Sequence, residues 1–215
     1  INATLDDRNQ RINGSAAITY HNNSPHQLTY LWLQLDQNRF KQDSDSNSSA
    51  PAPSLQPKIS FRDMGSLLAQ MSFEGGYKIE RVVGFGTDDD DDDDDNANNR
   101  GEINGNLAAT LPPNRKAGKP LDHTIVKTMM RIDLDKPLMP GDSIKFQIDY
   151  SYNIVDAKVM FARGGYEYFT EDENYIYEIS QWFPRVVAYT DYAGWQNKQF
   201  LGRGEFTLEL GDYVV

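Results

Sequence analysis

The segment from Ser143 to Tyr152 constrains the fold more than any other part of the chain, because its side chains alternate strictly between polar and apolar. The apolar positions are Ile144, Phe146, Ile148, Tyr150 and Tyr152, and the polar ones are Ser143, Lys145, Gln147, Asp149 and Ser151. A period of two residues is typical of a β-strand with one face in a core and the other in solvent. The segment therefore predicts a strand of an antiparallel sheet with a buried face.

Other segments predict further strands at short intervals along the chain. They are residues 1–5, 12–20, 28–35, 77–85, 102–111, 124–134 and 175–183. Gly14 is interpreted as a bulge inside the second strand, and the Pro140-Gly141 pair marks a turn over residues 135–142. The fold class we expect is all-β: an antiparallel β-sandwich or saddle of two or more sheets, with residues 1–215 forming a single domain.

A single short helix is predicted between Ser60 and Met71. Ser60 is a possible N-cap, and Asp63 follows it at the spacing of a capping interaction. Met64, Leu67, Leu68 and Met71 recur at helical spacing.

Two loops are predicted from composition, near residues 41–57 and 86–100. The first is rich in Asp, Ser, Asn, Ala and Pro and offers nothing to bury, so we expect it to be flexible. The second contains eight consecutive aspartates, Asp88 to Asp95. Carboxylates are calcium ligands, but a homopolymer lacks the glycine that turns a calcium loop, so a solvated acidic loop is favoured and calcium binding stays open.

Composition excludes several classes of protein. The formal net charge of −11 argues against nucleic acid as a partner. No stretch approaches the ~20 apolar residues of a membrane-spanning helix, so we expect a soluble chain without a membrane span. The absence of cysteine excludes disulfides and Cys-based zinc sites. The cellular location stays open, with an exported one (periplasmic, surface or extracellular) preferred over the cytoplasm.

No catalytic or metal-binding motif was found in the sequence. His21, His26 and His123 fall in expected loops without ligand spacing, and the H-E-x-x-H pattern of zinc peptidases does not occur. G-x-S-x-G and a cysteine nucleophile are also missing. The residues alone therefore predict a non-catalytic β domain without a cofactor.

Three stretches, in this order and spacing, resemble one protein family. They are Gly14 to Pro25 followed by Leu31 to Leu35, then Asp135 to Asp142, and the closing stretch from Gln181 to Tyr213. Together they are similar to the amino-terminal domain of bacterial members of the aminopeptidase N and leukotriene hydrolase family of zinc peptidases.

The resemblance implies a β-saddle domain that precedes a thermolysin-like catalytic domain. In that family the zinc ligands, the H-E-x-x-H base and the G-A-M-E-N motif belong to the catalytic domain, which would follow Val215. We therefore expect a fragment of a larger multidomain peptidase, with zinc in the catalytic domain only. The expected partners are that catalytic domain and a peptide substrate.

The resemblance also implies candidate residues for substrate binding. In the family, a Gln or Glu ahead of an aromatic-Pro element helps to hold the free amine of the substrate. Phe183-Pro184 is present here, but Ile179 stands where the family has Arg. Glu178 and Gln181 are the best candidates, with ordinary polar positions on a strand as the alternative.

Two further questions stay open at this level. Four aromatic residues could line a side-chain pocket or pack in the core, and core packing is favoured: Trp182, Trp195, Phe200 and Phe206. The alternative function is a stand-alone β-sandwich that binds a carbohydrate or a protein.

Overall fold

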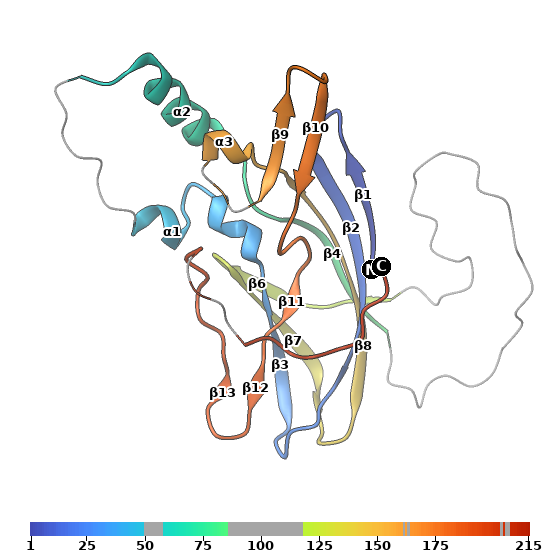
Figure 1. Ribbon diagram of the computed structural model, residues 1–215. Helices are drawn as coiled ribbons and strands as arrows, with labels where there is room; N and C mark the ends of the chain where they lie inside the picture. Colours follow the sequence, from blue (N-terminus) through green and yellow to red (C-terminus); the bar gives the residue numbers. More distant parts are fainter. Residues whose placement is uncertain (50–57, 86–117, 161, 163, 203, 205–206) are drawn as a thin grey trace, which may run out of the picture.

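Two antiparallel sheets form the body of the molecule in the computed structural model (Figure 1). The described residues are 1–49, 58–85, 118–160, 162, 164–202, 204 and 207–215. Three predictions lie outside them: the strand over 102–111, the acidic run Asp88 to Asp95 within the 86–100 loop, and the role of Phe206.

The first sheet has five strands in the order β1-β2-β8-β4-β5. Their bounds are Asn2–Asp6 for β1, Arg11–His21 for β2, Ser143–Asn153 for β8, Lys78–Phe85 for β4 and Lys119–Pro120 for β5. The second sheet has four strands in the order β11-β3-β7-β6. Their bounds are Arg185–Val186 for β11, Leu28–Gln34 for β3, Met129–Leu138 for β7 and His123–Val126 for β6.

The core lies between the two sheets. Phe146 and Ile148 of β8 join Leu31 and Leu33 of β3 and Ile132 of β7 in one buried cluster. Each of these side chains is at most 1% exposed. Burial of one such side chain stabilises the folded state by ~1.5–3 kcal/mol. This free energy favours packing of the two sheets face to face. The expected all-β, antiparallel, sandwich-like fold is confirmed.

The central strand β8 has two buried residues on its polar face, in contrast to the prediction, whereas Ser143, Lys145 and Asp149 on that face are half-buried. Gln147 is 5% exposed and Ser151 is not exposed at all. Ser151 accepts a hydrogen bond from Arg11 of β2 and donates one to Glu80 of β4 at 3.2 Å. Long side chains of the neighbouring strands thus cover Ser151 on the outer face of β8. The alternation within β8 cannot predict this burial, because it depends on residues of other strands.

Gly14 is not at a bulge. The register of β1 and β2 runs without a shift from Asn2↔Ser15 to Asp6↔Arg11. The ring of Tyr150 on β8 lies against the glycine instead, and a Cβ atom at residue 14 would stand 2.3 Å from its Cζ. A glycine is needed because the tyrosine occupies the space of a side chain, not because the strand bends.

Two strand predictions need correction. Residues 124–134 form a hairpin of β6 and β7, which turns at Lys127 with a φ of 55°. The strand expected over 175–183 ends at Glu178, because Gln181 also has a positive φ, of 55°. It forms β10 (Asn174–Glu178), paired with β9 (Gly165–Phe169). Beyond residue 206, an isolated bridge joins Leu208 to Val187.

The predicted helix is present as α2 (Phe61–Ser72). The hydroxyl of Ser60 accepts a hydrogen bond from the Asp63 amide at 3.1 Å and donates one to the Asp63 carboxylate at 2.6 Å, so the N-cap prediction is confirmed. Shorter helices are η1 (Asp36–Phe40), α1 (Asp45–Ser48) and α3 (Ala157–Met160). Helix α1 lies within the stretch for which we expected a flexible loop. None of the described helices is long and apolar enough to cross a membrane.

Candidate functional site

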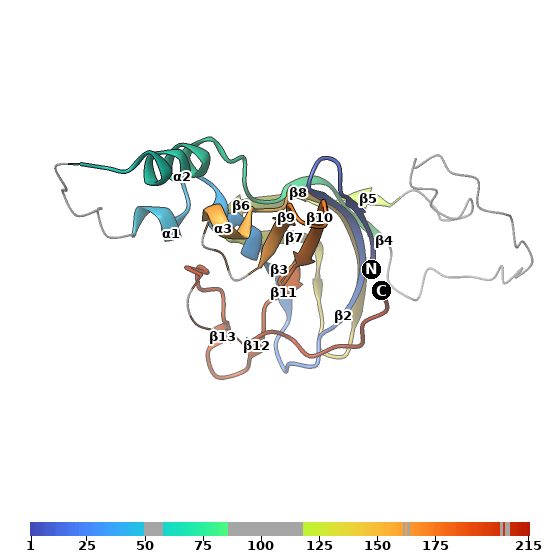
Figure 2. The ribbon, with the colours of Figure 1, turned by 45° about the horizontal axis from the view of Figure 1, so that its top comes forward.

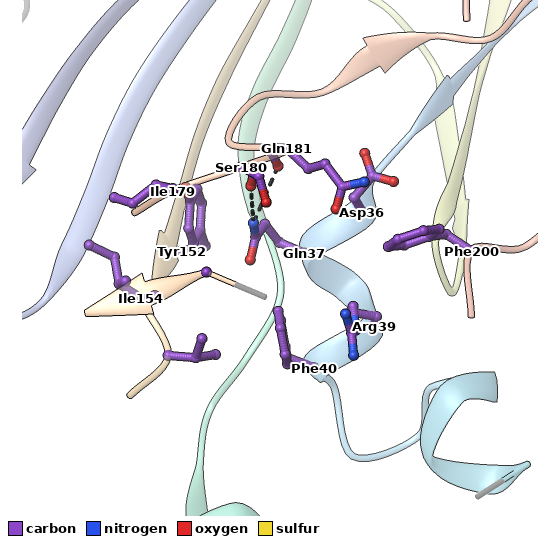
Figure 3. A pocket seen from close by; sticks show the side chains of 13 residues that line it. Asp36, Gln37, Arg39, Phe40, Tyr152, Ile154, Ile179, Ser180, Gln181 and Phe200 are labelled. Atoms are coloured by element: carbon purple, nitrogen blue, oxygen red, sulfur yellow. Dashed lines mark hydrogen bonds between the residues drawn. The ribbon is translucent and has the colours of Figure 1, made fainter. Parts of the chain in front are cut away.

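Gln181 and Glu178, the two predicted substrate-binding residues, lie in different surroundings. Glu178 is the last residue of β10, opposite Gly165 of β9, and its side chain is exposed. Gln181 lies in the irregular link between β10 and β11, and its side chain lines a small cavity (Figure 3). Glu178 is not among the residues that line this cavity. The structure therefore does not bring the two candidates together in one pocket.

The backbone of Gln181 is fixed by two side chains from distant parts of the sequence. Its carbonyl oxygen accepts a hydrogen bond from the hydroxyl of Tyr77 at 2.9 Å and another from the amide of Gln37 at 3.3 Å. The same Gln37 amide donates to the carbonyl of Ser180 at 3.1 Å (Figure 3). These bonds hold a non-glycine residue in the left-handed region, which costs energy unless the surroundings determine it.

The cavity beside Gln181 is too small for a substrate. Its volume is about 30 Å³, whereas ligand pockets in proteins measure roughly 300–1,000 Å³. A water molecule needs roughly 10–15 Å³ by this measure, so the cavity has room for a water but not for an amino acid. The buried hydroxyl of Tyr152, which has no hydrogen-bond partner among the described residues, belongs to a side chain that lines it.

A buried ion pair lies at the edge of the same cavity. Asp36 of η1 is 1% exposed, and its carboxylate lies 2.6 Å from the guanidinium of Arg185 in β11. The amide of Gln34 donates to the other carboxylate oxygen at 2.8 Å. Because β11 also pairs with β3 at Gln34 and Leu33, this contact joins the closing stretch to the second sheet.

Buried tyrosines behind the ion pair have no acid–base role near neutral pH. The ring of Tyr77 packs edge-on against Tyr150 at 5.5 Å and against Tyr152 at 5.2 Å. Burial raises the pKa of all three hydroxyls, well above their ordinary value of 10.0 in the case of Tyr77. They stay protonated and neutral, and contribute packing.

Two of the three stretches that carry the family resemblance contact each other through Asn22. Its amide donates to the carbonyl of Leu138 at 3.0 Å and to that of His26 at 2.8 Å. Its backbone N–H donates to the carbonyl of Asp142 at 2.9 Å, and its carbonyl accepts from the N–H of Gly141 at 2.8 Å. The first stretch is thus bonded to the 135–142 turn.

The closing stretch is bonded to the first stretch in turn. The N–H of Val187 donates to the carbonyl of Trp32 at 2.9 Å, beside the pairing of β11 with β3. We call this joint, from residues 182–187 to the strand 31–35, the seam.

Core packing is confirmed for three of the aromatic residues: Trp182 and Trp195 pack against the buried cluster, and Phe200 is 4% exposed.

A larger groove lies on the other side of the closing stretch. Its volume is about 520 Å³, and its walls are the second half of β2, residues 183–186 and residues 209–214. Burial and the carboxylate of Glu209 raise the pKa of Tyr20, one of its lining residues. No pattern in the sequence predicts this groove, because its walls come from three segments that are far apart in the chain.

Within the described ranges, no three His, Asp or Glu side chains are placed so that they could hold a metal ion. Comparison with protein-family models, with curated proteins and with solved structures found no match to this chain.

Proposed function

We propose that this chain is the non-catalytic amino-terminal β domain of a zinc metallo-aminopeptidase-like protein. In this proposal it packs on a catalytic domain outside residues 1–215 and helps to shape the substrate cleft. The family comes from the sequence resemblance, and the need for a packing partner comes from one structural observation, the apolar face of α2.

Helix α2 directs its apolar face away from the body of the molecule. Five side chains form this face: Phe61 is 89% exposed, Met64 39%, Leu67 44%, Leu68 59% and Met71 65%. At 100° per residue they fall within one third of the helix circumference. An exposed apolar face of this kind marks an interaction surface.

The opposite, polar side of α2 is the one that contacts the protein. Ser66 and Gln70 are the least exposed residues of the helix. The amide of Gln70 donates to the carbonyl of Val159 at 3.1 Å, and the amide of Gln42 donates to the carbonyl of Gln70 at 2.8 Å. Figure 1 shows α2 beside α3, outside the two sheets. Helix α2 is thus attached to the protein by its polar side and leaves its apolar side exposed. This orientation is an argument for a second domain that packs on the apolar side.

Amide hydrogen exchange of α2 in the parent protein tests this proposal. We expect slower exchange in the parent than in chain 1–215, and we expect Leu68→Glu in the parent to abolish the difference. Ala69→Glu, on the polar side of the same helix, is the matched control and should leave the protection intact. Equal exchange rates of α2 in the parent and in chain 1–215 would show that no domain covers the helix.

The second candidate function is a stand-alone β-sandwich that binds a protein or a carbohydrate. The 520 Å³ groove favours it, since a ligand site of ordinary size falls in this range. The reading frame discriminates between the two: an H-E-x-x-H motif within ~100 residues after Val215 supports the peptidase, and a stop codon close to Val215 supports the binding module.

A further inference from the structure

Another groove lies on the outer face of the four-stranded sheet, between β3 and the hairpin of β12 (Tyr189–Thr190) and β13 (Gly194–Trp195). Its volume is about 360 Å³, within the roughly 300–1,000 Å³ of ligand sites. We call it the aromatic groove, and residues 27–30, 32, 189, 193–195 and 197 line it. All of them belong to internal segments. Both views of the ribbon place the two chain ends beside β2, away from this hairpin (Figures 1 and 2).

Four aromatic rings line the aromatic groove from two walls. Tyr30 and Trp32 alternate along β3 with leucines of the core, so they lie on the face of the sheet opposite the core. Tyr189 and Trp195 are paired across β12 and β13, with ring centres 5.1 Å apart. Each of the four side chains is half-buried. Tyrosine and tryptophan offer a rigid, largely apolar surface at a low cost in conformational entropy.

The rings are held in place before any ligand arrives. The hydroxyl of Tyr189 is hydrogen-bonded to Nδ1 of His26 at 3.0 Å. The indole N–H of Trp32 donates to the amide oxygen of Asn197 at 3.3 Å, in the amide orientation that satisfies both partners. Trp195 packs in addition against the buried cluster. A ligand that binds to a preformed site does not have to order it, which lowers the cost of binding.

The lining of the aromatic groove is uncharged. Charged residues make up 25% of the chain, yet none of the described residues that line the groove is one of them. The guanidinium of Arg131 stacks on Tyr30, 4.3 Å from its ring centre, but it is paired with Asp133. The amide of Gln27 and the hydroxyl of Thr29 are neutral groups that both donate and accept hydrogen bonds. A charged ligand would lose hydration here without gaining a counter-charge, so the lining suits a neutral ligand.

We propose that the aromatic groove binds a neutral oligosaccharide. A pyranose ring presents an apolar face of C–H groups, which stacks on Trp32, and a rim of hydroxyls, which bond to Gln27 and Thr29. A proline-rich peptide also suits aromatic grooves. Its prolines have no N–H, however, and supply no donor for the amide oxygen of Gln27, whereas a sugar hydroxyl both donates and accepts. The site is separate from the 520 Å³ groove, and the proposal does not depend on the aminopeptidase assignment.

The probes are maltotetraose, cellotetraose and mannotetraose, titrated separately into chain 1–215. We expect at least one of them to change the tryptophan fluorescence at millimolar concentration, and calorimetry gives its dissociation constant. Trp32→Ala should weaken this binding about tenfold, since it removes the ring on which the sugar stacks. Tyr192→Ala is the matched control. It removes an 86% exposed ring from the turn of the same hairpin, outside the groove, and should leave affinity unchanged.

A second variant, Gln27→Ala, changes an exposed residue and keeps the result independent of any effect of Trp32→Ala on folding. It should weaken binding by about two- to tenfold, as expected for the loss of one neutral hydrogen bond. No response to any of the three sugars would overturn the proposal. A response that both variants leave unchanged would also overturn it, because the sugar would then bind elsewhere. Binding of acetyl-octaproline amide in place of the sugars would identify a peptide site and contradict the proposal.

Discussion

The carboxylate of Asp36 and the guanidinium of Arg185 are 2.6 Å apart, and this contact joins residues separated by 149 positions. It fixes the closing stretch to the turn that follows β3. The charge of Arg185 therefore has a structural partner next to the seam, Asp36, and is not available to a substrate.

Removal of the charge at Asp36 should destabilise the fold strongly. In Asp36→Asn the guanidinium of Arg185, whose side chain is 21% exposed, loses its buried counter-charge, which costs about 3 kcal/mol of unfolding free energy. The double variant with Arg185→Met removes the orphaned charge and should recover part of that loss. Urea denaturation of the three proteins measures both effects, and a loss below ~1 kcal/mol in the single variant would contradict a buried ion pair.

Asn22 should contribute more to stability than its polar character suggests. Asn22→Ala leaves the buried carbonyl of Leu138 and that of His26 without their donor, so we expect a loss of about 2–4 kcal/mol. The neighbouring Asn23 is exposed, and Asn23→Ala should cost less than ~0.5 kcal/mol. Equal unfolding free energies for the two variants would refute the role of Asn22 as the link between the stretches.

Two glycine-to-alanine substitutions should have opposite effects. Gly14→Ala forces a methyl group into the ring of Tyr150 and should destabilise the protein by about 1–3 kcal/mol. Gly65 lies within α2 with nothing within 4 Å of its Cβ position, so Gly65→Ala should stabilise it by about 0.5–1 kcal/mol. Thermal melts of both variants check the signs, and destabilisation by both would contradict the open surroundings of Gly65.

The buried tyrosines predict a loss of stability at alkaline pH. Burial raises the pKa of Tyr150 and Tyr152 in the folded protein, while the unfolded chain ionises near 10. Their stabilising contribution is therefore complete below pH 10 and falls as the pH rises above it. Urea midpoints measured from pH 8 to 11 should decrease above pH 10.

Tyr150→Phe separates this effect from general alkaline unfolding. Its hydroxyl has no hydrogen-bond partner among the described residues, so the variant should be as stable as the parent chain at pH 8, or ~1 kcal/mol more stable. It should also lose less stability above pH 10. Tyr192, 86% exposed, serves as the control, and Tyr192→Phe should show the unchanged pH profile.

Local patterns in the sequence were sufficient to predict much of the fold. The alternation in residues 143–152 identified β8, and Ser60 with Asp63 identified the start of α2. The errors arose where a distant residue decides the structure. Gly14 is required by the ring of Tyr150 on another strand, and the polar face of β8 is covered by Arg11 and Glu80.

The candidate site was harder to predict than the fold. The substrate-binding role of Gln181 stays a prediction, and the side chains that position this residue, Gln37 and Tyr77, precede it by more than 100 residues and carry no motif. Arg185 next to Phe183-Pro184 was the available signal that a buried carboxylate partner was needed. Nothing in the sequence identified Asp36 as that partner, because contacts between distant segments follow from the packing of the two sheets.

Hydrolysis of aminoacyl-anilide substrates, with zinc content determined on the same samples, tests whether this chain is the non-catalytic domain of a zinc aminopeptidase. We expect that the parent protein contains zinc and cleaves these substrates, whereas chain 1–215 neither retains zinc nor cleaves them. Cleavage by chain 1–215 alone would contradict its non-catalytic role. A parent protein without zinc and without activity would contradict its assignment to a zinc aminopeptidase.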